Sequence, residues 1–359
     1  MPRPIRAGFK LAALRHNLGV ARRHAPHSRI WAVVKADAYG HGLVRVAQAL
    51  AADGYAVLDL NEAVLLREAG ITRPLLLLEG VFQPEDLATV DRYALTPVVH
   101  DSEQILMLER ARLSSQIAVL LKLNTGLNRL GFGGAQVRSA YSRLEASGKV
   151  AAISLMSHFA DADGAPGIDA QLGRFAEWTA GLHAEATLAN SAAVLRYPET
   201  HADWVRPGIM LYGCSPFADL SAQQLGLQPV MTLTSEIIAV QDLKPGDRVG
   251  YGGTFVAPQA MRIGVVACGY ADGYPRHAPG FNDRNTPIIV AGKRTVTVGR
   301  VSMDTLCADV SAIPEARVGS AVTLWGEGLS ADEVASAAGT VSYELLCALA
   351  ARVPQLEIE

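Results

Sequence analysis

A lysine and a tyrosine four residues apart follow an apolar run near the N-terminus. The segment 32–42 reads AVVKADAYGHG, in which Lys35 ends the apolar run and Tyr39 begins the sequence YGHG. Burying a lysine at a strand end is costly, and this cost lowers its pKa and makes it an amine nucleophile toward a carbonyl. Taken alone, Lys35 is more simply interpreted as a solvated lysine at the end of a strand. The residues that follow it are compatible with a helix.

Polar side chains also follow several later apolar runs. They are Asn124–Arg129, His158, the pair Asn190 and Ser191, and the pair Arg206 and Gly208. In a barrel of parallel strands, the groups that do chemistry gather at the carboxyl ends of the strands. Each residue by itself has a structural interpretation, and His158 could simply be a hydrogen-bonded histidine. Their convergence after successive strands is what predicts a site.

A phosphate site is predicted from the last of these groups. Ser191 can cap the helix that follows it, and Gly208 lets the backbone approach an anion closely. Barrels of this kind commonly bind phosphate after their seventh and eighth strands. A helix cap and a turn glycine are the simpler interpretation. With the amine of Lys35 across the barrel mouth, a phosphorylated aldehyde fits both ends of the site.

The elements that must position these residues alternate between short apolar runs and amphipathic stretches, as in βα units. The expected strands are 30–34, 56–58, 75–78, 95–99, 117–123, 152–157, 185–188 and a last one near 209–211. The clearest expected helices are 43–52, 62–69, 102–111 and 170–184. Eight units favour a (β/α)8 barrel over an open Rossmann sheet, which has fewer strands and a glycine fingerprint in its first turn.

The residue pattern of the sequence changes beyond Gln228, where runs of β-branched residues are interrupted by Gly, Pro and Asp. We therefore expect a barrel domain spanning 1–227, which carries the predicted site, and a second, mostly β domain spanning 228–359. The boundary is uncertain by about ten residues, because sequence patterns locate element ends less well than element types.

Composition excludes several classes of function. The chain has 359 residues, of which 50% are hydrophobic, and its formal net charge is −3. This balance favours a folded enzyme and gives no electrostatic case for binding nucleic acid or an anionic membrane. Its four cysteines are far apart, so we expect free thiols in the cytoplasm and assign no metal site. No apolar run is long enough to span a bilayer.

The chain resembles the alanine racemases, and the resemblance extends over nearly all of it. Beside AVVKADAYGHG, the segments that carry it are LKLNTGLNRLGF (121–132), SHFADAD (157–163), NSAA (190–193), RPGIMLYG (206–213), VGYGGTF (249–255), GYADGYPR (269–276), GRVSMD (299–304) and SYE (342–344). They occur in the family's order. One short motif would be weak evidence, whereas an ordered set across both expected domains is strong evidence.

The resemblance implies pyridoxal 5'-phosphate as cofactor, held through an imine to Lys35. It implies that Arg206 faces the pyridine nitrogen and that Arg129 serves the phenolic oxygen and the substrate carboxylate. The residues implied around the phosphate are Tyr39, Ser191, Gly208, Ile209 and Tyr343. Tyr251 and Met303, from the strand-rich domain of a second subunit, would complete the substrate pocket.

The implied reaction removes the α-proton of alanine on one face and returns it on the other, which needs two bases. Lys35 would serve the D-alanine face and Tyr251 the L-alanine face. A free tyrosine has a pKa near 10, so ionising it at neutral pH costs about 4 kcal/mol. His158 and Arg206 are the expected cationic network that lowers this cost. Arg206 can hydrogen-bond the pyridine nitrogen without protonating it, which limits side reactions.

Some implied residues also have structural interpretations. Tyr251 could be an exposed aromatic in a glycine-rich turn, and Met303 and Tyr343 could be core residues. Tyr270 is expected to line the substrate entryway. Because the second base lies in a domain apart from the barrel mouth, the resemblance and the chemistry both predict a head-to-tail homodimer with shared active sites.

Lys122 is expected to be carbamylated. It alternates with Leu121 and Leu123 on one strand, so it faces the barrel interior near the mouth. A free ammonium there would be buried and would repel Arg129, whereas a carbamate would accept hydrogen bonds from it. The matching lysine in the family often carries this group. An unmodified lysine paired with a carboxylate is the alternative.

Two other functions stay open from the residues. One is a racemase of broader specificity on the same fold, because a single methylene changes specificity by only about 1–3 kcal/mol. The other is a non-catalytic pyridoxal-phosphate-binding protein. Whether the reaction supplies D-alanine for peptidoglycan or degrades L-alanine is also open.

Overall fold

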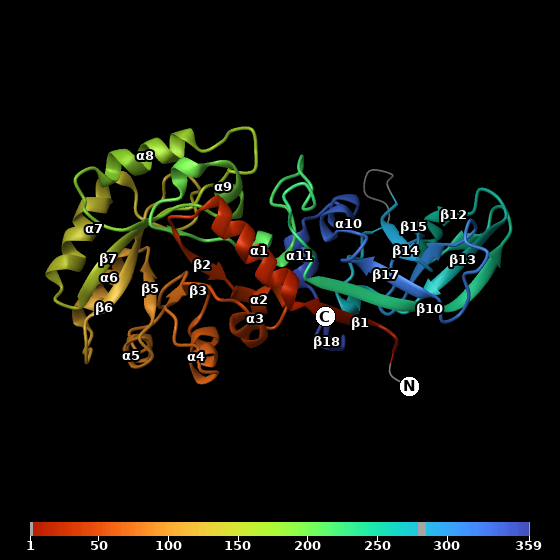
Figure 1. The fold of residues 1–359 in the computed structure, drawn as a ribbon, viewed down its shortest axis with the longest axis horizontal. Coiled ribbons are helices and arrows are strands. Elements are labelled where there is room, and N and C mark those ends of the chain that lie inside the picture. The colour runs from red at the N-terminus through yellow and green to blue at the C-terminus, as the bar shows by residue number, and fades with distance from the viewer. Residues whose placement is uncertain (1–2, 279–284, 359) are drawn as a thin grey trace.

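A closed barrel and a strand-rich domain lie side by side along the long axis of the molecule (Figure 1). This computed structural model describes residues 3–278 and 285–358. The two halves confirm the expected fold class, a (β/α)8 barrel followed by a mostly β domain.

Eight parallel strands close the barrel in chain order. They are β2 (Arg29–Val33), β3 (Gly54–Val57), β4 (Leu75–Leu77), β5 (Thr96–Val99), β6 (Ile117–Lys122), β7 (Val150–Met156), β8 (Ala186–Thr187) and β9 (Trp204–Val205). All residues of β3 and β4 are buried, because side chains fill the barrel interior on one face and helices cover the other.

The helices around the barrel begin at polar caps in several places. Asp59 accepts the Glu62 N–H at 3.0 Å, and Asp101 accepts the Glu103 N–H at 2.8 Å. The helices of this half are α1 (Leu11–His24), α2 (Lys35–Gly40), α3 (Leu43–Ala49), α4 (Leu60–Glu68), α5 (Asp86–Arg92), α6 (Ser102–Arg110), α7 (Gly134–Ala146), α8 (Asp169–Thr179) and α9 (Ser191–Arg196). Among the described residues, no helix combines the length and apolarity needed to cross a membrane.

The eighth barrel strand is not where the sequence placed it. The expected strand near 209–211 is instead a 3-10 helix, η2 (Ile209–Tyr212), which follows a second one, η1 (Pro198–Thr200). The strand that closes the barrel is β9, and it pairs with β2 through Arg29 and Trp204. Because β9 has only two residues, its apolar run was too short to be recognised. Arg206 and Gly208 therefore both follow the eighth strand.

The strand-rich domain is built on an eight-stranded sheet in the order β13-β16-β15-β14-β17-β10-β1-β18. Its elements are β10 (Met231–Leu243), β13 (Met261–Val266), β14 (Pro287–Val290), β15 (Lys293–Val298), β16 (Leu306–Asp309), β17 (Ala321–Trp325), β18 (Gln355–Ile358), α10 (Ala331–Ala337) and α11 (Ser342–Cys347). A small hairpin of β11 (Arg248–Val249) and β12 (Phe255–Val256) carries η3 (Tyr251–Gly253), and η4 (Tyr270–Asp272) follows β13.

The first strand, β1 (Arg6–Lys10), belongs to this sheet rather than to the barrel. Gly8 is opposite Thr232 of β10 in an antiparallel pair and opposite Leu356 of β18 in a parallel pair. Residues 6–10 therefore depart from the expected division at residue 227, which assigned them to the barrel domain. A pairing between segments this far apart leaves no local pattern in the sequence. Elsewhere the position of the domain boundary stays a prediction.

Candidate active site

A cavity of about 320 Å³ opens at the carboxyl ends of the barrel strands. Ten of the residues predicted for the site line it: Lys35, Tyr39, Lys122, Arg129, His158, Ser191, Arg206, Gly208, Ile209 and Tyr343. Nine of them come from the barrel half, and Tyr343 comes from α11 of the strand-rich domain. The fold thus gathers one cluster from segments spread over most of the chain.

The backbone after Lys35 adopts a left-handed turn instead of the expected ordinary helix. Ala36, Asp37, Ala38 and Tyr39 have φ between 52° and 56°. For L-residues this conformation costs about 1–2 kcal/mol each, so the surrounding structure must hold it. Asp37 accepts the Leu43 N–H at 2.7 Å, and the buried His41 ring contacts the carbonyls of Ala38 and Tyr39 through Nδ1 at 3.1 and 2.8 Å. Strain of this kind is typical of functional sites.

The cavity is strongly cationic. Lys35, Lys122, Arg129 and Arg206 line it together, and Glu79 is the carboxylate that faces them there. Burial and then Arg129 lower the pKa of Lys35, while burial and then Arg206 lower the pKa of Lys122 to about 8. A lowered pKa increases the share of uncharged amine, which is the nucleophilic form. The excess of positive charge suits a ligand that carries phosphate and carboxylate groups.

Arg206 is buried and reaches only neutral acceptors in the described part of the chain. Its guanidinium donates to Thr187 Oγ1 at 2.6 Å, to the Ser157 carbonyl at 2.6 Å and to His158 Nδ1 at 3.4 Å. Burial lowers the pKa of Arg206 to about 9, so it stays charged at neutral pH.

The same contact determines the state of His158. The pKa of His158 lies well below its usual value, chiefly because the ring is buried and then because Arg206 and Arg129 repel a proton. A guanidinium can only donate, so Nδ1 accepts and the hydrogen of the neutral ring lies on Nε2. His158 can therefore donate one hydrogen bond from Nε2.

A candidate anion cradle lies around Ser191 in the same cavity as Lys35. The Ser191 hydroxyl accepts from the backbone N–H of Gly208 at 2.8 Å. A side chain at Gly208 would put its Cβ 2.6 Å from Tyr39 Oη, so only glycine lets the two segments approach this closely. Tyr39 also stacks on Tyr212, with ring centroids 4.6 Å apart. Hydroxyl groups and a close backbone make a donor set that suits a phosphate.

The remaining predicted residues lie away from this cavity. Tyr251 is 71% exposed and Met303 is 53% exposed, both in the strand-rich domain. Tyr270 of η4 is also exposed. Within the described residues of one subunit, the structure therefore does not bring Tyr251 and Met303 to Lys35.

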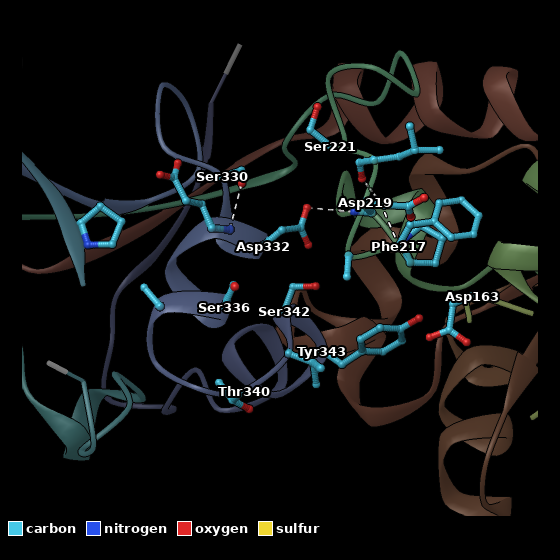
Figure 2. A pocket seen from close by; sticks show the side chains of 18 of the residues that line it. Asp163, Phe217, Asp219, Ser221, Ser330, Asp332, Ser336, Thr340, Ser342 and Tyr343 are labelled. Atoms are coloured by element: carbon cyan, nitrogen blue, oxygen red, sulfur yellow. Dashed lines mark hydrogen bonds between the residues drawn. The ribbon is translucent and has the colours of Figure 1, made fainter. Parts of the chain in front are cut away.

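A larger cleft of about 1260 Å³ adjoins the cavity between the barrel and the strand-rich domain. Figure 2 shows Tyr343 and Asp163 on its walls together with residues of α10 and α11. Asn190 and Tyr343 line both the cleft and the cavity. The cleft is thus open space beside the predicted cofactor site.

Sequence reasoning missed two ionisable residues of the lining, Glu79 and Cys347. Glu79 closely follows β4, so the rule that found His158 applies to it as well. Cys347 lies four residues after Tyr343 on α11, which places both on one face of that helix. Both positions had a usable signal.

The closed barrel, its lysine at the mouth and the appended strand-rich domain define an enzyme of the (β/α)8 class. Residues 9–216 match the family model described as alanine racemase, N-terminal domain, and residues 230–357 match alanine racemase, C-terminal domain. The chain is 59% identical to an alanine racemase of Cupriavidus necator over 99% of this chain and 95% of that protein.

Solved structures agree. The biosynthetic alanine racemase of Pseudomonas aeruginosa superimposes with a TM-score of 0.96 at 47% identity, covering 99% of this chain and all of the other. That of Acinetobacter baumannii gives 0.93 at 39% identity, with 99% and 100% covered. The chain belongs to the alanine racemase family and is an enzyme of that family.

Proposed function

We propose that this enzyme uses pyridoxal 5'-phosphate and interconverts L- and D-alanine with two bases. Lys35 is the base on the D-alanine face, and Tyr251 of the partner subunit is the base on the L-alanine face. The observation that carries the proposal is a single cavity lined by both the half-buried amine of Lys35 and the Ser191 cradle. A phosphorylated aldehyde matches both groups.

The residues present fit that cofactor. Lys35 would hold it covalently, and Tyr39, Ser191, Gly208, Ile209 and Tyr343 would surround its phosphate. When bound, the cofactor supplies an aldehyde for the amine and a ring that withdraws electrons from the α-carbon of the amino acid.

Arg206 is suited to face the pyridine nitrogen. It is charged and buried, and it donates but cannot accept a hydrogen bond. It would therefore orient the ring without giving the nitrogen a proton. Its bonds to Thr187 and Ser157 fix the guanidinium in place.

Tyr251 needs help to act as a base, because its phenol is weakly acidic in water. The cationic pair of Arg206 and Arg129 would favour the phenolate of a tyrosine that enters the cavity from a partner. His158 would donate its Nε2 hydrogen to that oxygen and link it to Arg206. The neutral state of His158 suits this role.

Substrate binding would fall to Arg129 and Met303. Arg129 would receive the carboxylate of alanine and the phenolic oxygen of the cofactor, and Met303 of the partner subunit would close the pocket around the methyl group. A carbamate on Lys122 would replace a repelling charge beside Arg129 with an accepting one.

The dimer is part of this proposal. Tyr251 and Met303 are exposed on the strand-rich domain. The cavity lies in the barrel and opens beside a large cleft. A head-to-tail homodimer would bring the two together and give each site residues from both subunits.

Mixed dimers test the shared site. Subunits carrying Lys35→Ala and subunits carrying Tyr251→Phe are each expected to be inactive alone, and a heterodimer of the two should regain one working site. Chiral chromatography of D-alanine formed from L-alanine is the measurement. A heterodimer as inactive as its parents would contradict the shared site, and active Lys35→Ala homodimers would contradict the role of Lys35.

A further inference from the structure

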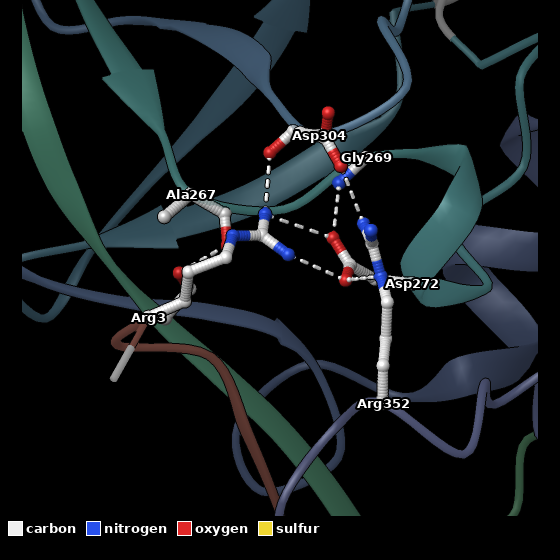
Figure 3. A network of polar contacts seen from close by, with 7 residues as sticks. Arg3, Ala267, Gly269, Asp272, Asp304 and Arg352 are labelled. Carbon is white, nitrogen blue, oxygen red and sulfur yellow. Dashed lines mark hydrogen bonds and ion pairs between the residues drawn. The ribbon is translucent and has the colours of Figure 1, made fainter.

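The carboxylate of Asp272 lies between two arginines that come from opposite ends of the chain (Figure 3). Its side chain is fully buried. Oδ1 accepts from Arg3 at 2.7 Å and from Arg352 at 2.8 Å, and Oδ2 accepts from Arg3 at 3.1 Å and from the Gly269 N–H at 2.9 Å. A buried charge is tolerated when it is paired and its acceptor sites are filled, as they are here.

The same two arginines reach a second loop. Arg3 donates to the Asp304 carbonyl at 2.6 Å, and Arg352 donates to the Asp304 carboxylate at 2.7 Å. Figure 3 shows Asp272 and Asp304 bridged by both guanidinium groups. The loop 269–274 and the loop 299–305 are thus tied together by planar forks, which fix direction as well as distance.

Backbone contacts make the two loops one unit. The N–H groups of Tyr270 and Ala271 donate to the carbonyls of Ser302 and Met303, both at 3.0 Å. A Cβ on Gly269 would lie 2.3 Å from the Met303 carbonyl, so the loops touch where only glycine fits. A movement of one loop must therefore move the other.

This unit presents two large side chains to the outside. Tyr270 is 38% exposed and Met303 is 53% exposed, although their backbones are held by the buried carboxylate of Asp272 and its partners. Exposed side chains on a rigidly braced backbone are the usual design of a preorganised binding face.

We propose that Asp272, held between Arg3 and Arg352, is a positioning residue that sets Tyr270 and Met303 for the active site of the partner subunit. The inference rests on the proposed shared site. Asp272 does not itself reach the cavity at the barrel mouth. It acts through the two loops that it braces.

The expected effect is on substrate binding more than on turnover. Tyr251 lies on the hairpin of β11 and β12, to which Asp272 makes no hydrogen bond. This hairpin lies against the start of the second loop, where a Cβ on Gly250 would be 3.3 Å from the Arg300 backbone. Tyr270 and Met303 lie on the braced loops themselves, so loosening these loops should disturb their contacts more than it disturbs Tyr251. We expect Asp272→Asn to raise KM for alanine about 10-fold with kcat within about 2-fold of the parent, because uniform binding is lost.

Two heterodimers of the holoenzyme, separated by different affinity tags, test where Asp272 acts. In the first, one subunit carries Lys35→Ala together with Asp272→Asn and the other is unchanged, so the one working site faces the altered loops. In the second, Lys35→Ala and Asp272→Asn are on different subunits, so the working site faces intact loops. The proposal predicts a raised KM in the first heterodimer and a parental KM in the second.

Matched variants keep this result clear. Glu315→Gln breaks the exposed pair with Lys293, 2.7 Å long, in the same domain and should change KM in neither arrangement. Where Asp272→Asn does not yield a folded dimer, Arg352→Gln replaces it, because Arg352 is only partly buried.

Equal KM values in the two heterodimers, whether both parental or both raised, overturn the positioning role. The reverse pattern, with the raised KM in the second heterodimer, contradicts the shared site itself. The activity of the Lys35→Ala and Tyr251→Phe heterodimer then tells which proposal has failed, since it does not depend on Asp272.

Discussion

Replacing Lys122 tests the proposed carbamate, and the structure sets the magnitude. Lys122 is 5% exposed, and burial beside Arg206 and Arg129 lowers its pKa from 10.5 to about 8. At pH 7 the uncharged amine then makes up about a tenth of Lys122, roughly 300-fold more than for an unperturbed lysine. Only the uncharged amine attacks carbon dioxide, forming an N–C bond and releasing a proton. The cavity thus favours the modification in two ways. It increases the fraction of uncharged amine, and its arginines stabilise the carbamate anion that results.

We expect Lys122→Ala to lower kcat/KM by about 10- to 100-fold, since a hydrogen bond to a charged group contributes about 1.5–3 kcal/mol. Chloride or small carboxylic acids should restore part of the activity by replacing the lost negative charge near Arg129. Lys122→Arg is the matched control, because it keeps the positive charge and cannot be carbamylated. It should be as impaired as Lys122→Ala.

The direct assay is carbon-13 NMR of the enzyme equilibrated with labelled carbon dioxide. A carbamate signal is expected in the parent enzyme and not in Lys122→Ala. A parent without that signal, with a bare amine at Lys122 paired to Glu79, would refute the reasoning. So would full activity of Lys122→Arg.

The other predictions concern the two bases and one buried histidine. Lys35→Ala should lose both the visible absorption of the bound cofactor and racemisation, and an unchanged spectrum would mean that another lysine holds the cofactor. Tyr251→Phe should keep that absorption but lose α-deuterium washout mainly from L-alanine in single turnovers, whereas equal loss from both enantiomers would contradict a one-face role. His41 is fully buried, and burial lowers its pKa from 6.5 to about 4. Between these pH values His41 is therefore protonated in the unfolded chain and neutral in the folded chain. Stability should therefore fall by up to about 3 kcal/mol as the pH drops from about 6.5 to 4, and His41→Gln should flatten that part of a denaturation–pH profile. A parental slope in His41→Gln would assign the acid sensitivity to other groups.

The sequence by itself determined the class of fold and most of the cavity. Barrel strands such as β2 and β6 are apolar runs whose length and flanking residues are visible locally. Once strands are placed, the residues after them are known, and parallel strands bring those residues to one edge. Lys35, His158 and Ser191 line the cavity for this reason.

Features that depend on distant segments were decided by the tertiary structure. β9 is too short to show a pattern, and it is a strand because β2 and β8 pair with it on either side. The first strand, β1, pairs with β10 and β18, which both lie beyond residue 230. Pairing of this kind depends on how whole sheets pack, and it cannot be predicted from the local propensity of a segment.

The left-handed turn at Ala36–Tyr39 is the clearest feature that local sequence patterns do not predict. Alanine favours the right-handed helix, so local preference opposes the observed backbone. The turn exists because the Asp37 carboxylate, the His41 ring and the stack of Tyr39 on Tyr212 hold it. The sequence determined that a lysine and a tyrosine lie close together after a buried strand. Only the folded chain determined the backbone path that brings them to one cavity, because that path is held by side-chain contacts that include a stack on the distant Tyr212.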